Sequence, residues 1–273
     1  MQTQLYAVAF DASFIHKSGK HTPCTGYFWS GCAGKTLRGL EVLSLSLVDA
    51  DSRMSFHLKA TQTPPANCLS DHELSLPDWY AAVIKKDLAQ ISALTSYLVA
   101  DAYFSKKGFV DKIMDMNLHL VCKLRDDADL LYLSKQAPTG KRGRPSTYAG
   151  KVNPENLDAD CFQEVENNQN IKAKSAVVYS KSLGRNILVI VEEFIIKGKT
   201  TYRLLFSTDI NQAPIDVIDI YHTRFQFSMR DTKVLFHNAL LLQRFFAMFG
   251  NPPNSRKNRE YFNELLNFGT LAA

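Results

Sequence analysis

Leu5-Tyr-Ala-Val-Ala-Phe10, followed directly by Asp11, is the stretch that decides the fold. Six nearly unbroken apolar residues predict a strand that is buried on both faces, at the centre of a sheet. A carboxylate directly after such a strand needs a hydrogen-bond donor or a cation. Taken alone, Asp11 is more often a side chain that caps the next turn. The rest of the chain has to decide between a cap and a ligand.

Composition sets broad limits on the class of protein. The chain has 273 residues, 45% of them hydrophobic and 22% charged, as in a soluble globular protein with one large domain or two small ones. No stretch is long and apolar enough to predict a membrane span, so no membrane partner is expected. The 5 cysteines form no CxxC pair, which supports neither a disulfide framework nor a zinc site and fits a reducing cytoplasm. The net charge of +5 permits a polyanion partner without demanding one.

Two alternating segments follow the first strand. Residues 42–47 and 54–59 alternate apolar and polar side chains, and Asp49-Ala-Asp-Ser52 between them is typical of a turn. The pattern predicts a hairpin beside the first strand, which gives three antiparallel strands.

A second strand that ends in an aspartate follows a helical segment. Apolar residues recur at helical spacing from Trp79 to about Thr95, and Tyr97-Leu-Val-Ala-Asp101 then predicts a strand. A short helix over 109–116 leads to a further strand over 118–125, and this order indicates a parallel crossover. Ligands of open α/β sheets gather beyond the carboxyl ends of such strands. Asp101 lies at that edge, and Asp11 would lie there too if its strand runs parallel.

The chain changes character after residue 125. A basic, helix-breaking loop and a polar segment are followed by three apolar runs, which predict an inserted β-rich subdomain rather than a continuation of the first sheet. The last part predicts helices, the first of which begins at Pro214. The expected domains are 1–125, 126–206 and 207–273.

Seven short stretches, each unspecific alone, occur in one order over most of the chain. They are Phe10-Asp-Ala-Ser-Phe-Ile-His-Lys-Ser-Gly-Lys20, Phe28-Trp-x-Gly31, Leu98-Val-Ala-Asp-Ala-Tyr-Phe-Ser-Lys106, Lys123-Leu-Arg-x-x-Ala128, Arg142-Gly-Arg-Pro145, Leu205-Phe-Ser-Thr-Asp209 and Tyr221-x-x-Arg224-Phe-Gln. Together they resemble the catalytic domain of bacterial insertion-sequence transposases of the DDE type. The resemblance implies an α/β, ribonuclease-H-like fold. Its expected parts are a mixed five-stranded sheet, flanking helices and a β-rich insertion before the last catalytic helix.

The same resemblance implies that Asp11 and Asp101 are the first two metal-binding acids, with Mg²⁺ or Mn²⁺ as the cofactor. Hard cations prefer carboxylate oxygens. Two such ions about 4 Å apart can activate the attacking oxygen and stabilise the leaving oxygen of a phosphodiester. The alternative is that both aspartates are caps or buried, hydrogen-bonded acids.

The third acid of the family is missing from its expected position. The resemblance places a glutamate one helical turn after Arg224, where this chain has Ser228, and Lys233 arrives two residues early. Losing two residues turns the rest of a helix by about 200°. Tyr221, Arg224 and Lys233 would then be catalytic neighbours whose acid is gone, or else solvated charges of an ordinary amphipathic helix. Asp231 is the nearest substitute acid, and its short side chain makes it a weak one.

Basic residues in the matched stretches and loops are the candidates for DNA binding. An extended Arg-Gly-Arg flanked by proline can insert two guanidiniums into an A·T-rich minor groove, although four such residues are also typical of a flexible basic loop. The others would neutralise phosphates, unless they lie in solvated turns. The candidates are Lys17, Lys20, Lys106, Arg125, Arg142 and Arg144.

The leading hypothesis is a DDE-type transposase catalytic domain that cleaves double-stranded DNA at transposon ends and transfers the strands. We expect it in the bacterial cytoplasm, associated with the nucleoid, as a truncated or degenerate copy without the third acid. A homodimer is left open. One alternative is a non-catalytic DNA-binding transposase remnant, and another is a ribonuclease-H-like nuclease with a different third acid.

Overall fold

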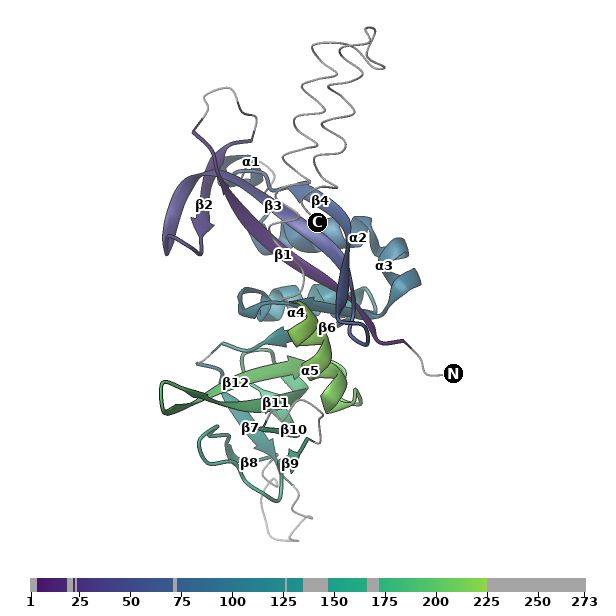
Figure 1. The fold of residues 1–273 in the computed structure, drawn as a ribbon, viewed down its shortest axis with the longest axis vertical. Helices are drawn as coiled ribbons and strands as arrows, with labels where there is room; N and C mark the ends of the chain where they lie inside the picture. The colour runs from purple at the N-terminus through teal and green to yellow at the C-terminus, as the bar shows by residue number, and fades with distance from the viewer. Residues whose placement is uncertain are drawn as a thin grey trace, which may run out of the picture. The chain divides into compact units, whose positions relative to one another are not determined.

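The computed structural model describes residues 4–18, 22, 24–70, 73–125, 127–134, 147–165 and 172–224 (Figure 1). The chain forms two compact units. Unit 1 consists of Met1–Asp11, Leu45–Leu58 and Pro64–Phe227, and unit 2 of Ala12–Ser44, Lys59–Thr63 and Ser228–Ala273.

Three parallel strands form the centre of unit 1. They are the first half of β1 (Tyr6–His16), β5 (Tyr97–Ala100) and β6 (His119–Lys123). Val8 pairs with Leu98 and Ala9 with Val99, and β5 pairs with β6 in the same direction. The predicted parallel crossover is confirmed, and so is the parallel orientation of the strands that carry Asp11 and Asp101.

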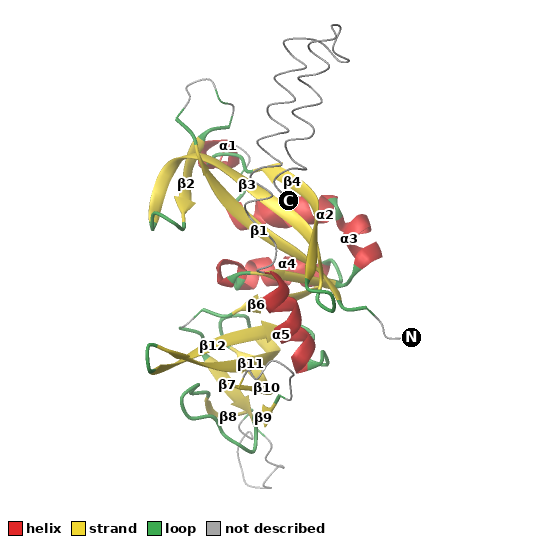
Figure 2. Cartoon of the chain, viewed as in Figure 1, coloured by secondary structure: helices red, strands yellow, loops and turns green. Residues whose placement is uncertain are grey.

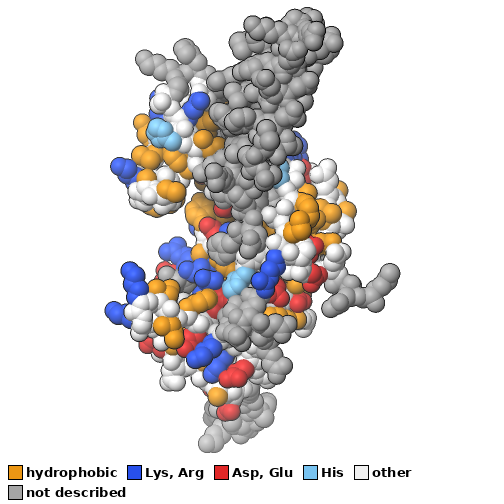
Figure 3. All heavy atoms as spheres, in the orientation of Figure 1, with side chains coloured by type: hydrophobic (Ala, Val, Ile, Leu, Met, Phe, Trp, Pro, Cys, Tyr) orange, Lys and Arg blue, Asp and Glu red, His pale blue; other side chains and the backbone are white. Residues whose placement is uncertain are grey.

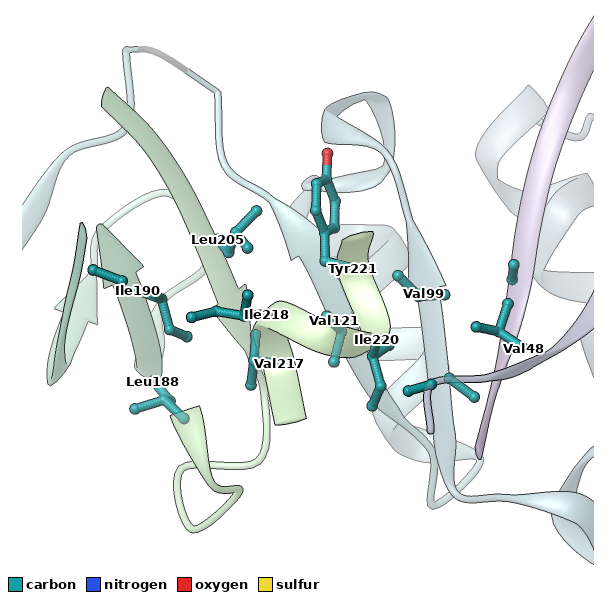
Figure 4. Packing of buried hydrophobic residues seen from close by; sticks show 14 residues of the cluster. Val48, Val99, Val121, Leu188, Ile190, Leu205, Val217, Ile218, Ile220 and Tyr221 are labelled. Atoms are coloured by element: carbon teal, nitrogen blue, oxygen red, sulfur yellow. The ribbon is translucent and has the colours of Figure 1, made fainter. Parts of the chain in front are cut away.

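One face of these strands is covered by α5 (Pro214–Thr223), and we call it the α5 face. Side chains alternate along a strand, so Ala7 and Ala9 on β1 share this face with Val99 on β5 and Val121 on β6. All four belong to one buried cluster. Figure 4 shows Val217, Ile218 and Ile220 of α5 among the sheet residues of this cluster. The helix begins at Pro214, as the sequence predicted.

The opposite face carries an aromatic core. Phe10 points away from the α5 face and its ring centroid lies 4.3 Å from that of Phe104, 5.6 Å from that of Phe109 and 5.9 Å from that of Tyr80. These rings come from the short helix η1 (Ala102–Phe104), from α4 (Lys107–Asp115) and from α2 (Leu76–Lys86). The first strand is therefore buried on both faces, as its sequence predicted.

The helical segment before β5 is divided in two. Ser75 caps α2 by accepting a hydrogen bond from the Asp78 backbone N–H, and α2 ends at Asp87, where α3 (Leu88–Leu94) begins. The single helix expected from Trp79 to about Thr95 is therefore wrong. Asp87 leaves helical geometry, with φ −102° and ψ 10°. Aspartate has a low helix propensity, because its side chain hydrogen-bonds nearby backbone groups in non-helical conformations. α1 (Ala66–Ser70) precedes them. Among the described residues, no helix has the length and apolar character needed to cross a membrane.

Six antiparallel strands continue the sheet beyond β6 (Figure 2). They are β7 (Leu130–Leu133), β8 (Tyr148–Lys151), β9 (Gln163–Glu164), β10 (Lys172–Ser180), β11 (Arg185–Ile196) and β12 (Lys199–Ser207).

β12 joins these strands to the centre of the sheet. Phe206 pairs with Cys122, and the order from the centre outward is β1-β5-β6-β12-β11-β10-β7-β8. The sheet has 12 strands, so the expected sheet of five strands is wrong. The physical reason is that the edge of β6 presents backbone N–H and C=O groups, which an antiparallel β12 satisfies. The domain boundaries at 125/126 and 206/207 stay a prediction.

Unit 2 contains the antiparallel pair of β2 (Gly26–Ser30) and the first part of β3 (Lys35–Asp49). Gly39 is required there, since a Cβ at this position would lie 2.3 Å from the carbonyl oxygen of Ile15. The later part of β3 turns into β4 (Met54–Gln62), which pairs with it. Asp49 Oδ1 accepts hydrogen bonds from the N–H groups of Asp51 and Ser52, which confirms the predicted hairpin and its turn.

Candidate active site

The two predicted metal-binding acids lie on neighbouring parallel strands. Asp101 directly follows β5, whereas Asp11 lies within β1, which continues to His16, so the expectation that the first strand ends at Asp11 is wrong. The paired residues Val8–Leu98 and Ala9–Val99 fix the register of β1 and β5. Continuing that register by two residues sets Asp11 opposite Asp101. Neighbouring strands lie about 4.8 Å apart, so the backbones of the two acids are close enough for their carboxylates to share a pair of ions.

Both acids also belong to the α5 face. Asp11 is two residues after Ala9 in β1, and Asp101 is two residues after Val99 at the end of β5. Ala9 and Val99 both pack in the cluster under α5. Since side chains alternate along a strand, both carboxylates are positioned on the side that α5 covers.

Asp101 also has a structural role. Its Oδ1 accepts a hydrogen bond of 3.0 Å from the backbone N–H of Tyr103, which makes it the N-cap of η1. The interpretation of Asp101 as a cap is therefore correct, and it does not compete with ligation. A carboxylate has two oxygens and about four acceptor positions, so one donor leaves room for a cation.

Tyr221 and Arg224 are buried at the end of α5. Only 2% of Tyr221 and 9% of Arg224 is exposed, and the guanidinium lies 5.1 Å from the centre of the tyrosine ring. Burial raises the pKa of Tyr221, while a hydrogen bond and the charge of Arg224 oppose the rise. The alternative interpretation of these two residues as solvated charges of an amphipathic helix is therefore wrong. A neutral phenol fixes the guanidinium beside the sheet.

Cys122 lies beside Asp101, and sequence analysis missed it. Its Sγ lies 2.8 Å from the Asp101 carbonyl oxygen, to which the thiol donates a hydrogen bond. Burial raises the pKa of Cys122 far above its usual value, Asp101 raises it further, and Arg224 lowers it. Asp101 and Arg224 thus act electrostatically on the same buried thiol. Only the pairing of β5 with β6 could have revealed this residue.

Two of the predicted DNA-binding cations are neighbours at the same edge. Lys106 Nζ lies 3.8 Å from the ring centre of Tyr103. Burial lowers the pKa of Lys106, and the positive charge of Arg125 lowers it further. The Nε of Arg125 lies 3.2 Å from Asp127 Oδ1. Lys106 and Arg125 are therefore close enough to act on one another electrostatically.

The strand pairing adds two cations that the sequence did not single out. Ala100 pairs with Cys122, so the next residues, Asp101 and Lys123, face one another across β5 and β6. Arg203 on β12 has the parity of Leu205, which belongs to the α5 face. Figure 3 shows Lys and Arg side chains gathered at this part of unit 1.

A fully buried carboxylate anchors α5. Glu192 on β11 has no exposed surface, and its Oε1 lies 2.8 Å from His222 Nε2 on α5. Its Oε2 lies 3.4 Å from Arg203. β11 is three strands away from β5, about 14 Å at the usual strand spacing, so Glu192 is too far from Asp101 to share its metal ions. The acid holds the helix rather than replacing the missing ligand.

The remaining predicted residues contribute less to the described site. Lys17 follows β1 in unit 2 and is partly buried. Over the residues that the structure describes, no group of three His, Cys, Asp or Glu side chains could hold a metal ion. Five predicted residues lie outside the described residues: Lys20, Arg142, Arg144, Asp231 and Lys233.

Comparison with known protein families agrees with the sequence motifs. A family model described as DDE superfamily endonuclease matches residues 2–181, well over half of the chain. The matched part includes Asp11, Asp101 and the strands that position them, whereas Tyr221 and Arg224 lie beyond it. No curated protein matches the sequence.

Proposed function

Because the chain belongs to the DDE superfamily endonucleases, we propose that it is a transposase catalytic domain of the insertion-sequence type. Its reaction would be hydrolysis and strand transfer at double-stranded transposon ends. One observation carries the proposal. Asp11 in β1 and Asp101 directly after the adjacent parallel strand β5 share the α5 face, and Tyr221 and the C-cap Arg224 stand at the end of α5.

The strand order supports the finer assignment to a ribonuclease-H-like fold. β4 lies on β3, and the order continues through β1, β5 and β6, with β1, β5 and β6 parallel. The two central strands of this group deliver the two acids. β7 to β12 then stand between β6 and α5 in the sequence, which is where a β-rich insertion is expected.

The residues present fit a divalent metal. Asp11 and Asp101 would hold Mg²⁺ or Mn²⁺, since carboxylate oxygens are the ligands these ions prefer. The bound metal would activate the attacking oxygen and stabilise the leaving oxygen. Lys106 and Arg125 would bind the phosphate backbone and orient it across the strand ends. Arg224, fixed by Tyr221, would compensate the charge of the two acids and of the phosphate.

The chain's own activity is expected to be impaired. Ser228 stands where the family resemblance places the third acid, and a second ion between two carboxylates would lack that ligand. This observation favours a second candidate function, a DNA-binding remnant that does not cut. A nuclease that uses Asp231 instead is the remaining alternative.

The proposed partner is double-stranded DNA in a bacterial cytoplasm, close to the nucleoid. Lys17, Lys20, Arg142 and Arg144 would add phosphate or minor-groove contacts to those of Lys106 and Arg125. A homodimer is compatible with this function.

A nicking assay tests the proposal. Supercoiled plasmid is incubated with Mg²⁺ and the wild-type chain, or with a variant that has Ile-Glu inserted between Gln226 and Phe227. The insertion restores both the acid and the phase of the helix behind it. We expect negligible nicking by the wild type and clear nicking by the insertion variant. Ser228→Glu alone should help less, because Arg230 and Lys233 stay rotated.

Two outcomes would contradict parts of the proposal. Nicking by the insertion variant that persists after Asp101→Asn would reject the acid pair as the metal site. Cleavage by the wild-type chain that Asp231→Asn abolishes would show that Asp231 is the third ligand and that the chain is an active nuclease.

A further inference from the structure

The hairpin of β11 and β12 extends beyond the rest of the sheet. Pairing of β11 with β10 ends at Glu193, and pairing of β12 with β6 ends at Leu205. Within the described part of the chain, residues 194–201 therefore pair only with each other. Figure 1 shows the two strands projecting as a ribbon at the edge of unit 1.

The tip of this ribbon is narrow. Lys197 and Gly198 form the turn, with φ 52° and 75°. Two consecutive positive φ values define the tight two-residue turn whose twist matches that of the strands. Ile196 pairs with Lys199 across it. The ribbon thus ends in two strands and a two-residue turn, a width that fits a groove of duplex DNA.

Two large apolar side chains stand at the tip. Ile195 is 73% exposed and Ile196 is 55% exposed. Successive residues of a strand point to opposite faces, so each face of the ribbon carries one isoleucine. A single exposed apolar residue is ordinary on a protein surface. Two adjacent exposed isoleucines at a projecting tip indicate an interaction site. Strand formation alone does not require them, because threonine favours strands equally well and stays hydrated.

The charges at the tip select the kind of partner. Lys197 directly follows Ile196, Lys199 pairs with Ile196 across the turn, and the sequence has no acidic residue between Glu193 and Asp209. Lower on the ribbon, Arg203 pairs with the buried Glu192, and the register of β12 with β6 sets it opposite Arg125. β12 thus carries one cation at the tip, Lys199, and one nearer the edge that carries Asp101, Arg203. Apolar wedges flanked by lysine are the side chains that unstack and kink DNA.

We propose that the β11–β12 tip is a DNA wedge. Ile195 and Ile196 enter between base pairs of a duplex, and Lys197 and Lys199 contact the phosphates on either side. The bend would carry the duplex along Arg203 and Arg125 to the acid pair. The inference rests on the proposed function in one respect, that the polyanion held at Asp11 and Asp101 is DNA.

The test measures DNA binding by the full chain without metal. The probe is an A·T-rich duplex with 2-aminopurine near its centre and a fluorophore pair at its ends. Ile195→Thr combined with Ile196→Thr keeps the β-branched shape and removes the apolar contact. Lys197→Ala combined with Lys199→Ala removes the tip charge. Leu94→Ser is the matched control, an apolar residue of unit 1 on α3 that is 41% exposed.

The isoleucine variant and the lysine variant should differ in their DNA affinity, their fluorescence signals and their salt dependence. The isoleucine variant should bind about tenfold more weakly and lose the 2-aminopurine and bending signals, with an unchanged salt dependence. The lysine variant should reduce the slope of log K against log salt by about 2. The control should bind like the wild type. Circular dichroism of each variant checks that the fold is retained.

The outcomes separate this inference from the proposed function. Wild-type affinity and bending in the isoleucine variant would overturn the wedge and leave the proposed function standing. A wild-type chain that binds no DNA at any salt concentration would overturn both. If the isoleucine variant only loses self-association in sedimentation, the tip is a contact between copies of this chain and the wedge is rejected.

Discussion

The two ends of the central parallel strands of unit 1 differ in the neighbours of their carboxylates. At the carboxyl end, Asp101 has cations around it: Lys123 across the strand, Arg224 beyond Cys122, and the basic pair of Lys106 and Arg125 at the same edge. At the amino end, several aspartates gather with one another and with aromatic residues.

The amino end is built from hydrogen bonds. Tyr97 donates a hydrogen bond of 2.8 Å to Asp209, and burial together with Asp209 raises the pKa of Tyr97 to about 12. Asp51 accepts a hydrogen bond from the backbone N–H of Leu5. Burial raises the pKa of Asp216, and the charges of Asp219 and Asp51 raise it further.

The number of acids therefore does not distinguish the two ends, whereas the charges of their neighbours do. Acids surrounded by acids repel phosphate, whereas acids surrounded by cations can accept a metal ion and a polyanion together. Among the described residues, positive and negative charges are therefore distributed unevenly between the two ends of the same strands.

The largest expected effect comes from replacing one aspartate at each end of the strands by asparagine. In the variant with Ile-Glu inserted, Asp101→Asn should reduce Mg²⁺-dependent nicking by about a thousandfold or more, because a metal ligand is lost. Asp209→Asn should retain most of the activity. Equal losses from both changes, measured as initial nicking rates, would remove the functional distinction between the ends.

The next effect concerns the anchor of α5, the helix that runs between the two ends. Glu192→Gln should lower the free energy of unfolding by about 3 kcal/mol, because His222 and Arg203 lose a buried partner. Urea unfolding measures the change. Glu193→Gln is the matched control, since its pair with Lys172 at 3.9 Å is at the surface, and about 0–0.5 kcal/mol is expected. Similar values for both would show that Glu192 does not anchor the helix.

A smaller effect tests the charge contrast directly. Lys106→Ala combined with Arg125→Ala should weaken DNA binding about tenfold and reduce the salt slope by about 2. Asp216→Asn at the other end should leave the salt slope unchanged. Fluorescence titrations at several salt concentrations decide the matter. A loss that does not depend on salt would mean that the cations support the fold and do not contact phosphate.

The smallest effect is a stability change at the amino end. The folded pKa of Asp216 is raised, so its ionised form destabilises the fold, and this penalty grows as pH rises above the unfolded value of 3.8. Asp216→Asn should therefore raise the unfolding midpoint in urea at pH 7. The gain should shrink as pH falls toward 3.8. A variant less stable than the wild type at pH 7 would mean that Asp216 makes a favourable contact instead.

Local sequence patterns predicted the elements that carry the site. The apolar run before Asp11 and the one before Asp101 became neighbouring buried strands, and Pro214 began the helix that covers them. Local patterns failed where the pairing partner of a strand decided its place in the sheet. β12 reads as a strand of a separate subdomain, yet it pairs with β6 and extends the sheet.

The sequence by itself determined which apolar runs form the two central strands, that Asp101 directly follows the second of them, and that position 228 lacks a glutamate. These features follow from residue type and from periods of two or 3.6, which act over a few neighbours. Only the tertiary structure decided the register that sets Asp11 beside Asp101, and the burial of Glu192 against His222 on a distant helix. Such contacts join residues far apart in the chain, and they are chosen by packing and by the cost of burying a lone charge, which no local pattern contains.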